Sequence, residues 1–300
     1  MMDQIRRSEI IKGHANVAAP PWPYRRLKTG GIGISFVDHG PTAGCGAGLP
    51  LMLLHGAQGN WHHWRANIDA LALHHRLIVP DMPGFGLSDT MPDTNLAGIS
   101  AALSDLAQQL APGRMAIVGY SFGSLVACTL AAACPSAADR LLIINPPGWR
   151  ERSPEMVELQ MKASIRGKDA GVRAGVEFTL REIMLRNQQY VDEASLDQSV
   201  AAVRSLRLKT KEISRTVDLF DLLAAVRCPW RVVFSAEDPY HRYRLEERIS
   251  RLTEFRGAPC VTVVKQAKHW VQQDRPDAFN GLIERFATPS ASVDDLPASL

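Results

Sequence analysis

The sequence contains no apolar run near the roughly 18 residues that a membrane-spanning helix needs, and residues 1–28 have no apolar core of signal-peptide length. It also lacks a charge bias, because 34 Lys and Arg stand against 31 Asp and Glu, which leaves no basic footprint for nucleic acid. The five cysteines are scattered without a Cys-x-x-Cys pair and predict free thiols. These absences favour a cytoplasmic protein without a membrane span or a nucleic-acid partner.

The pattern that is present indicates a parallel sheet. Short, continuous apolar runs of the kind buried on both faces alternate with segments of helical periodicity. This alternation predicts an α/β fold with helices on both faces of the sheet, preceded by an antiparallel pair of strands at 24–28 and 32–37. The expected buried strands are 50–54, 76–80, 115–118, 140–145, 230–234 and 260–264.

Changes of composition divide the chain into five parts. Residues 1–23 end in a proline-rich stretch and predict a flexible arm. Residues 24–148 and 227–286 carry the strands and form the two parts of one core. Between them, residues 149–226 show helical spacing, dense charges of both signs and no strand-like run, which predicts a helical insertion of about four helices. Residues 287–300 are polar and contain proline, which favours a disordered tail.

The most informative motif is a Gly-x-Ser-x-Gly sequence from Gly119 to Gly123. An apolar strand precedes it and a small-residue helical pattern follows it, which is the context of a nucleophile elbow. The two glycines allow the close backbone approach that such a corner requires. Ser121 is therefore the candidate nucleophile, and the first amides of the following helix, beginning with Phe122, can donate to an oxyanion.

Two later loops supply the groups that a serine nucleophile needs. Asp238 and His269 each follow a predicted strand, so all three side chains are expected at the carboxyl ends of parallel strands. His269 can act as the base, and Asp238 can fix its tautomer and stabilise its imidazolium form. The adjacent Glu237 is an alternative acid.

The remaining histidines do not predict a metal site. His62 and His63, like His74 and His75, are adjacent, and neighbouring helical residues point in different directions. We therefore expect no shared metal, and the chemistry of the candidate residues requires no organic cofactor. His55 stands in a loop after a strand, where a hydrogen-bonding role within the loop is expected.

Five short segments, in the order in which they occur along the chain, resemble the motifs of the α/β-hydrolase family. The resemblance spans residues 50–286 and implies that family's fold, with residues 149–226 as its lid. It also implies that the backbone amides of Ala57 and Phe122 form the oxyanion hole. The matching segments are His55-Gly56, the turn from Asp81 to Ser88, the elbow from Gly119 to Gly123, the Asp238 loop and the His269 loop.

The segment from His269 to Asn280 resembles one subfamily, the meta-cleavage-product hydrolases, which cut carbon–carbon bonds in vinylogous diketo acids. This chain departs from that subfamily, because Tyr120 replaces asparagine and Ser124 replaces glycine. The oxyanion loop differs as well. The subfamily's lid arginine would correspond to Arg181 or Arg186. Tyr120 and Trp270 are further candidates for substrate contact.

The sequence thus favours hydrolysis of a small or medium acyl ester through an acyl-enzyme on Ser121. An aspartate at the elbow would have indicated the dehalogenase or epoxide-hydrolase branches, so the serine argues against both. Carbon–carbon hydrolysis remains the alternative, and a ligand-binding member without turnover is an alternative of another class. The oligomeric state is not predicted. Five apolar residues of the insertion either line the pocket or pack the lid itself: Phe178, Leu180, Ile183, Met184 and Leu185.

Overall fold

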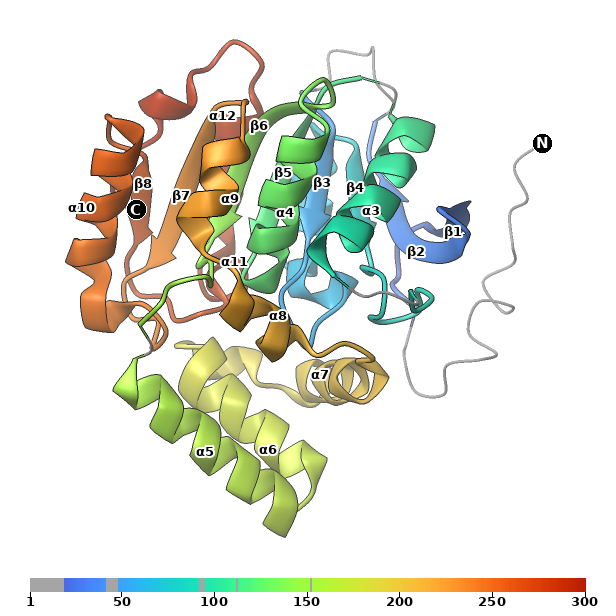
Figure 1. The fold of residues 1–300 in the computed structure, drawn as a ribbon. Coiled ribbons are helices and arrows are strands. Elements are labelled where there is room, and N and C mark those ends of the chain that lie inside the picture. Colours follow the sequence, from blue (N-terminus) through green and yellow to red (C-terminus); the bar gives the residue numbers. More distant parts are fainter. Residues whose placement is uncertain (1–18, 42–47, 92–94, 112, 152) are drawn as a thin grey trace.

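The computed structural model describes residues 19–41, 48–91, 95–111, 113–151 and 153–300. In these ranges the chain forms an eight-stranded sheet in the order β1-β2-β4-β3-β5-β6-β7-β8 (Figure 1). The first two pairings, β1 with β2 and β2 with β4, are antiparallel, and the others are parallel. The strands are β1 (Tyr24–Thr29), β2 (Ile32–His39), β3 (Leu51–Leu54), β4 (Leu77–Pro80), β5 (Met115–Tyr120), β6 (Ala138–Ile144), β7 (Trp230–Ser235) and β8 (Val261–Val264). This sheet confirms the predicted α/β class.

Strand β3 shows why the apolar runs are continuous. Met52 and Leu54 pack into the core on one face of the sheet, whereas Leu51 and Leu53 pack on the other, and all four are fully buried. The first face is covered by α3 (Leu96–Leu110), α4 (Phe122–Ala133), α9 (Leu219–Ala225) and α10 (Leu245–Arg256). The second is covered by η1 (Trp61–Trp64), α2 (Ile68–Leu71), α11 (Val271–Asp274) and α12 (Pro276–Ala287).

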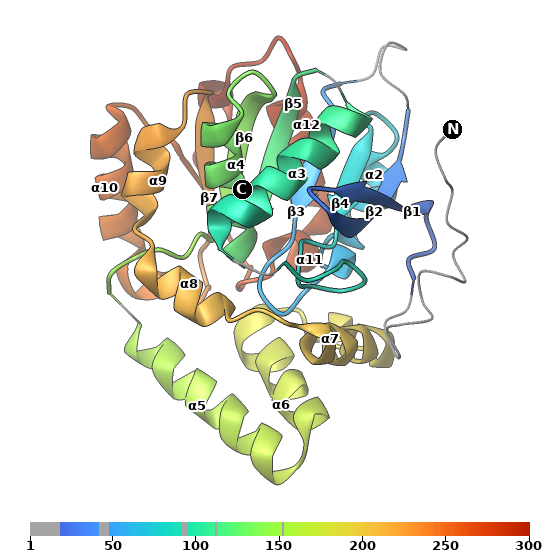
Figure 2. The ribbon, with the colours of Figure 1, turned by 45° about the vertical axis from the view of Figure 1, so that its right-hand side comes forward.

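A helical segment between β6 and β7 lies beyond the carboxyl ends of the parallel strands (Figures 1 and 2). Its outer helices pack closely at Gly175, where a Cβ atom would lie 2.9 Å from the Ala163 carbonyl oxygen. We expected all of residues 149–226 in this insertion, but α9 packs against α4 through Leu219 and Leu223 and belongs to the helical layer of the core. The other elements are α5 (Pro154–Asp169), α6 (Val172–Thr179), the π-helix η2 (Leu180–Met184), η3 (Gln188–Tyr190), α7 (Glu193–Ser205) and α8 (Thr210–Thr216).

The C-terminal segment is packed against the core, whereas most of the N-terminal segment is outside the described residues. Residues 1–18 of the expected N-terminal arm lie outside the described residues. The disordered tail expected for residues 287–300 is wrong, because Val293 and Leu296 are buried against the second face of the sheet. Arg231 of β7 explains this placement, since its buried guanidinium donates to three carbonyl groups of the tail. The tail includes the short helix η5 (Val293–Asp295).

None of the helices in the described ranges combines the length and the apolar character that crossing a membrane requires.

Candidate active site

The corner between β5 and α4 holds Ser121 in a strained conformation. Its φ of 51° and ψ of −120° lie outside the regions that non-glycine residues usually adopt. The two glycines of the motif make the corner possible. A Cβ atom on Gly119 would lie 2.4 Å from the Gly123 carbonyl oxygen, and one on Gly123 would lie 2.5 Å from that of His55. The corner is held to the next strand because the Ser121 amide donates to the Ile144 carbonyl at 2.8 Å.

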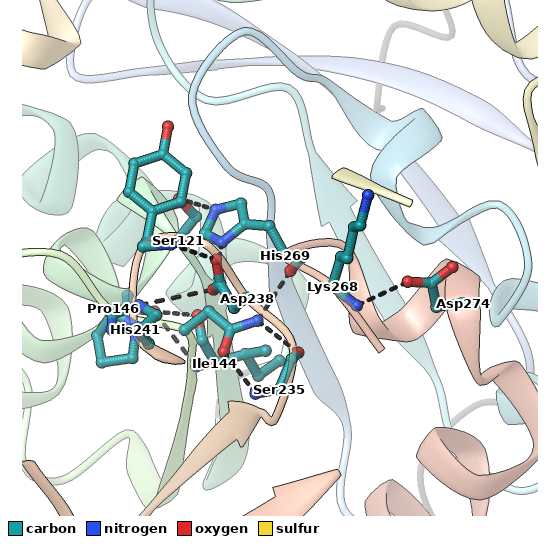
Figure 3. A network of polar contacts seen from close by, with 12 residues as sticks. Ser121, Ile144, Pro146, Ser235, Asp238, His241, Lys268, His269 and Asp274 are labelled. Atoms are coloured by element: carbon teal, nitrogen blue, oxygen red, sulfur yellow. Dashed lines mark hydrogen bonds and ion pairs between the residues drawn. The ribbon is translucent and has the colours of Figure 1, made fainter. Parts of the chain in front are cut away.

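His269 bridges the serine and the aspartate, as Figure 3 shows. Its Nε2 lies 2.9 Å from Ser121 Oγ, and its Nδ1 lies 2.7 Å from Asp238 Oδ2. A carboxylate only accepts, so Nδ1 carries the proton and Nε2 is free to accept the hydroxyl proton of Ser121. The structure therefore brings the three predicted side chains together, in the order that general-base activation of a serine requires.

Asp238 is completely buried, which makes its charge the sensitive point of the site. Burial acts to raise its pKa, but the neighbouring His269 and His241 rings, and hydrogen bonds from His269 and the Tyr240 amide, hold that pKa below the ordinary value. The alternative acid, Glu237, instead pairs with Arg186 at 3.0 Å. The geometry thus selects Asp238 as the partner of His269.

The loop that carries Ala57 is fixed by two buried histidines. His55 Nδ1 donates to the Gly56 carbonyl at 2.8 Å, while its Nε2 accepts from the Met82 amide. Burial lowers the pKa of His55 to about 4, so the ring is neutral at physiological pH. This is the structural role expected for it. His63 accepts from the Gly56 amide at 3.1 Å, a contact that the sequence did not indicate.

The oxyanion-hole candidates lie on opposite sides of Ser121 in the chain. Phe122 is the first residue of α4, so its amide is one of those that the helix leaves without an internal partner. Ala57 is followed by Gln58, whose φ of 58° is a second positive value beside the site. A tight turn at Ala57 and a helix start at Phe122 are the two sources of backbone N–H groups that this arrangement offers.

The candidate substrate contacts are placed differently from expectation. Tyr120 and Trp270 are both fully buried. The Tyr120 ring packs against His269, with centroids 5.3 Å apart, and Trp270 Nε1 donates to the His63 carbonyl at 2.8 Å. Both side chains therefore support the His63 and His269 segments from within the core.

The two arginines of the insertion are engaged in ion pairs. Arg181 Nε pairs with Glu177 at 2.9 Å, and Arg186 pairs with Glu237. Neither is directed to Ser121 by any contact in the described residues. Among the five apolar candidates, Leu180, Ile183 and Leu185 are buried, Met184 and Phe178 are half-buried, and Leu180 and Leu185 join the core on the second face of the sheet.

The His269 loop is attached to the insertion by several hydrogen bonds. The amides of His269 and Trp270 donate to carbonyl groups of the π-helix η2, at 3.3 and 2.8 Å. Asp274 accepts from three backbone amides, those of Lys268, Arg186 and Asn187. These bonds couple the position of the His269 loop to that of the insertion, and no local sequence pattern had singled out Asp274.

Asn145 fixes the same loop from the sheet. It follows β6 with a φ of 46°, and its side chain donates to the His269 carbonyl at 2.8 Å and to Ser235 Oγ at 2.9 Å. Asparagine tolerates this left-handed conformation better than most residues. The sequence could have indicated a role for Asn145, because it directly follows an apolar strand, as Ser121 does.

Within the described ranges no group of three or more His, Cys, Asp or Glu side chains is arranged to hold a metal ion.

Comparison with known proteins finds relatives in sequence and in fold. The model of the alpha/beta hydrolase family matches residues 51–282. Epoxide hydrolase 3 of Xenopus tropicalis is 32% identical over 293 residues, covering 88% of this chain and 77% of that protein. The pimeloyl-[acyl-carrier protein] methyl ester esterase of Pectobacterium carotovorum is 29% identical over 253 residues, covering 81% of this chain and 96% of the esterase. A meta-cleavage product hydrolase from Pseudomonas fluorescens shares the fold, with a TM-score of 0.68 at 20% identity, covering 87% of this chain and 96% of that structure.

Proposed function

Because this chain belongs to the alpha/beta hydrolase family, we propose that it is a serine hydrolase that cleaves carboxylic esters of small or medium acyl substrates. The observation that carries the proposal is the continuous hydrogen-bonded series Ser121–His269–Asp238, with 2.9 and 2.7 Å between the bonded atoms. Its hydrolase character follows from the family. The ester substrate and the acyl-enzyme are the proposal.

The proposed reaction has two steps. His269 Nε2 takes the hydroxyl proton as Ser121 Oγ attacks the acyl carbon, and the amides of Ala57 and Phe122 donate to the oxyanion that forms. His269 then gives its proton to the departing alcohol. In the second step the same nitrogen takes a proton from water as the water oxygen attacks the acyl carbon, and His269 then returns that proton to Ser121 Oγ as the bond between serine and acyl group breaks and the acid leaves. Asp238 keeps the imidazole in the tautomer that both steps need.

Epoxide hydrolysis fits the serine poorly, although epoxide hydrolases are among the relatives. A carboxylate that opens an epoxide forms an ester, which water can cleave at its carbonyl carbon. A serine that opened an epoxide would form an ether, which has no carbonyl for water to attack or for an oxyanion hole to stabilise. The presence of Ser121 at the elbow therefore supports acyl chemistry.

The residues whose pattern suggested carbon–carbon hydrolysis are engaged in contacts within the fold of this chain. Trp270 is buried under η1, and Asn280 accepts a hydrogen bond from Asn67 at 2.8 Å. The arginines that could bind a substrate carboxylate, Arg181 and Arg186, are paired with glutamates. These contacts favour the ester over the diketo acid. We further propose that the insertion serves as the lid over Ser121 and sets acyl specificity.

Turnover of p-nitrophenyl esters of increasing acyl length tests the proposal, with a vinylogous diketo acid and an aromatic epoxide as competing substrates. We expect cleavage of the short esters, loss of at least about 10³-fold in kcat for Ser121→Ala, and covalent labelling of Ser121 by an organophosphonate. Preferential turnover of the diketo acid or the epoxide would overturn the ester assignment. A folded chain that neither turns over an ester nor labels at Ser121 would indicate a ligand-binding protein.

A further inference from the structure

A second histidine faces the aspartate of the site from the side away from His269. His241 Nε2 lies 3.8 Å from Asp238 Oδ2, the same oxygen that accepts from His269, and Figure 3 shows the carboxylate between the two rings. The His241 ring is buried and packs against Phe234, with centroids 4.9 Å apart. It is thus held in the core as part of the surroundings of Asp238.

The other nitrogen of His241 contacts an arginine. Arg248 Nη1 bonds to His241 Nδ1 and also donates to the Tyr240 carbonyl at 2.8 Å. A guanidinium has donors only, so Nδ1 must be the unprotonated, accepting nitrogen. Burial lowers the pKa of His241 to about 3, so the ring is neutral at physiological pH and carries its single proton on Nε2. The contact with Arg248 therefore fixes the tautomer of His241.

In that tautomer the proton lies on the nitrogen nearest the triad. The N–H edge of the ring is hydrogen-bonded to the Asn145 backbone, and Asp238 Oδ2 lies beside this edge. The separation of 3.8 Å is too long for a hydrogen bond, but in a buried site it is close enough for a favourable charge–dipole interaction. A flipped tautomer would place a lone pair there and repel the carboxylate.

Arg248 is itself anchored to the start of the insertion. Its guanidinium is buried and stacks over the Trp149 ring, 4.8 Å from the centroid. Burial lowers the pKa of Arg248 to about 10, which leaves it charged at neutral pH. The His241 ring therefore lies between the positive charge of Arg248 and the Asp238 carboxylate. From there the charge favours an ionised Asp238, while His269 remains the direct hydrogen-bond partner of the carboxylate.

We infer that Arg248 and His241 are positioning residues for the triad: Arg248 fixes His241 in the tautomer whose N–H edge lies beside Asp238, and the partial positive charge of that edge holds Asp238 ionised and oriented for His269. The inference rests on the proposed serine hydrolase function and extends it by two residues that touch neither substrate nor Ser121.

The test compares two uncharged replacements of Arg248 that are similar in size but differ in their ability to donate a hydrogen bond to His241. Arg248→Met removes the donor to His241, whereas Arg248→Gln retains one. We expect Arg248→Met to lower kcat for a p-nitrophenyl ester about tenfold, with KM changed less than twofold, and Arg248→Gln to recover most of the loss. Arg251→Met is the matched control, because Arg251 also stacks on Trp149 but makes no contact with His241.

A second readout separates positioning from general damage to the fold. The downfield proton resonance of the His269–Asp238 hydrogen bond should shift in Arg248→Met and return in Arg248→Gln. In an Asp238→Asn background, Arg248→Met should have no further effect on the rate at which an organophosphonate labels Ser121. If Arg248→Met does not fold, the double variant His241→Phe/Arg248→Met removes both polar groups together, and the same tenfold loss of kcat is expected.

The outcomes distinguish this inference from the proposed function. Equal kcat values for Arg248→Met and Arg248→Gln, or an equal loss with and without Asp238, would overturn the inference while the wild-type chain still hydrolyses the esters. Failure of the wild-type chain to hydrolyse the esters or to label at Ser121 would overturn the proposed function itself.

Discussion

Ser124 lies three residues beyond the candidate nucleophile and ties together the strands on either side of the elbow. Its buried hydroxyl contacts the Gly119 carbonyl at 2.8 Å and the Ile144 carbonyl at 3.2 Å, and it accepts from the Ile144 amide at 3.3 Å. The meta-cleavage-product hydrolases that the sequence resembles have glycine at this position. The serine therefore gives this chain a bond between β5 and β6 that a glycine cannot make.

Replacing this side chain tests the bond. We expect Ser124→Ala to lower the free energy of unfolding by about 1–2 kcal/mol, because buried backbone groups lose a partner. Ser124→Gly should cost about 1 kcal/mol more, since glycine is a poorer helix former. Urea unfolding followed by circular dichroism measures both changes. A Ser124→Ala variant as stable as the wild type would show that the hydroxyl contributes nothing net.

The sequence predicted the three side chains that the fold brings together, but not the residues that support them, for a physical reason. Ser121, Asp238 and His269 each follow an apolar run, and that local pattern is readable because a central strand is buried on both faces. Asp274 acts on groups brought near only by folding, because it binds amides 87 and 88 residues away. His241 lies only three residues from Asp238 and seven from Arg248, but nothing in the local sequence records that its ring faces the carboxylate.

The short helix η1 contributes two buried, neutral histidines to the structure behind the site. His62 Nδ1 bonds to Asn60 Oδ1 at 2.6 Å, and burial, with the nearby Arg65 charge, lowers the pKa of His62 to about 3. The pKa of His63 is also held well below its usual value, mainly by burial. Unfolding releases both rings into water, where an imidazole takes up a proton near pH 6.5.

This difference predicts acid sensitivity with a definite sign. A group whose pKa is lower in the folded state stabilises the fold above the unfolded pKa and loses that contribution as pH falls. We expect His62→Asn to reduce the loss of unfolding free energy between pH 7.5 and pH 5 by about 2 kcal/mol relative to the wild type.

Urea titrations at the two pH values measure this. The same substitution at His74, which is exposed, is the control because no buried ring is removed there. An unchanged pH dependence in His62→Asn would mean that η1 opens before the rest of the molecule unfolds.

Across the whole molecule, the C-terminal tail shows where composition misleads. Residues 287–300 are polar enough to favour disorder, yet they close the second face of the sheet with Val293 and Leu296. Two strand arginines determine this placement. Arg140 donates to carbonyl groups of residues 286, 288, 289 and 291, and Arg231 to those of 293, 296 and 297. An arginine within a predicted strand does not by itself predict an ordered tail, because the sequence does not show which backbone carbonyls its guanidinium binds.

Removing the tail should therefore destabilise the molecule more than its few apolar contacts suggest. A chain that ends at Ala287 leaves the buried guanidinium of Arg231 without its tail carbonyls, and we expect a loss of about 3 kcal/mol or more in unfolding free energy. The sign of a second substitution identifies the cause. Arg231→Met should destabilise the full chain but stabilise the truncated one, because in the latter the guanidinium keeps only its bonds to Thr262 Oγ1 and to the Val261 carbonyl. Truncation without loss of stability, or Arg231→Met acting in the same direction in both chains, would show that the tail is held by apolar burial alone.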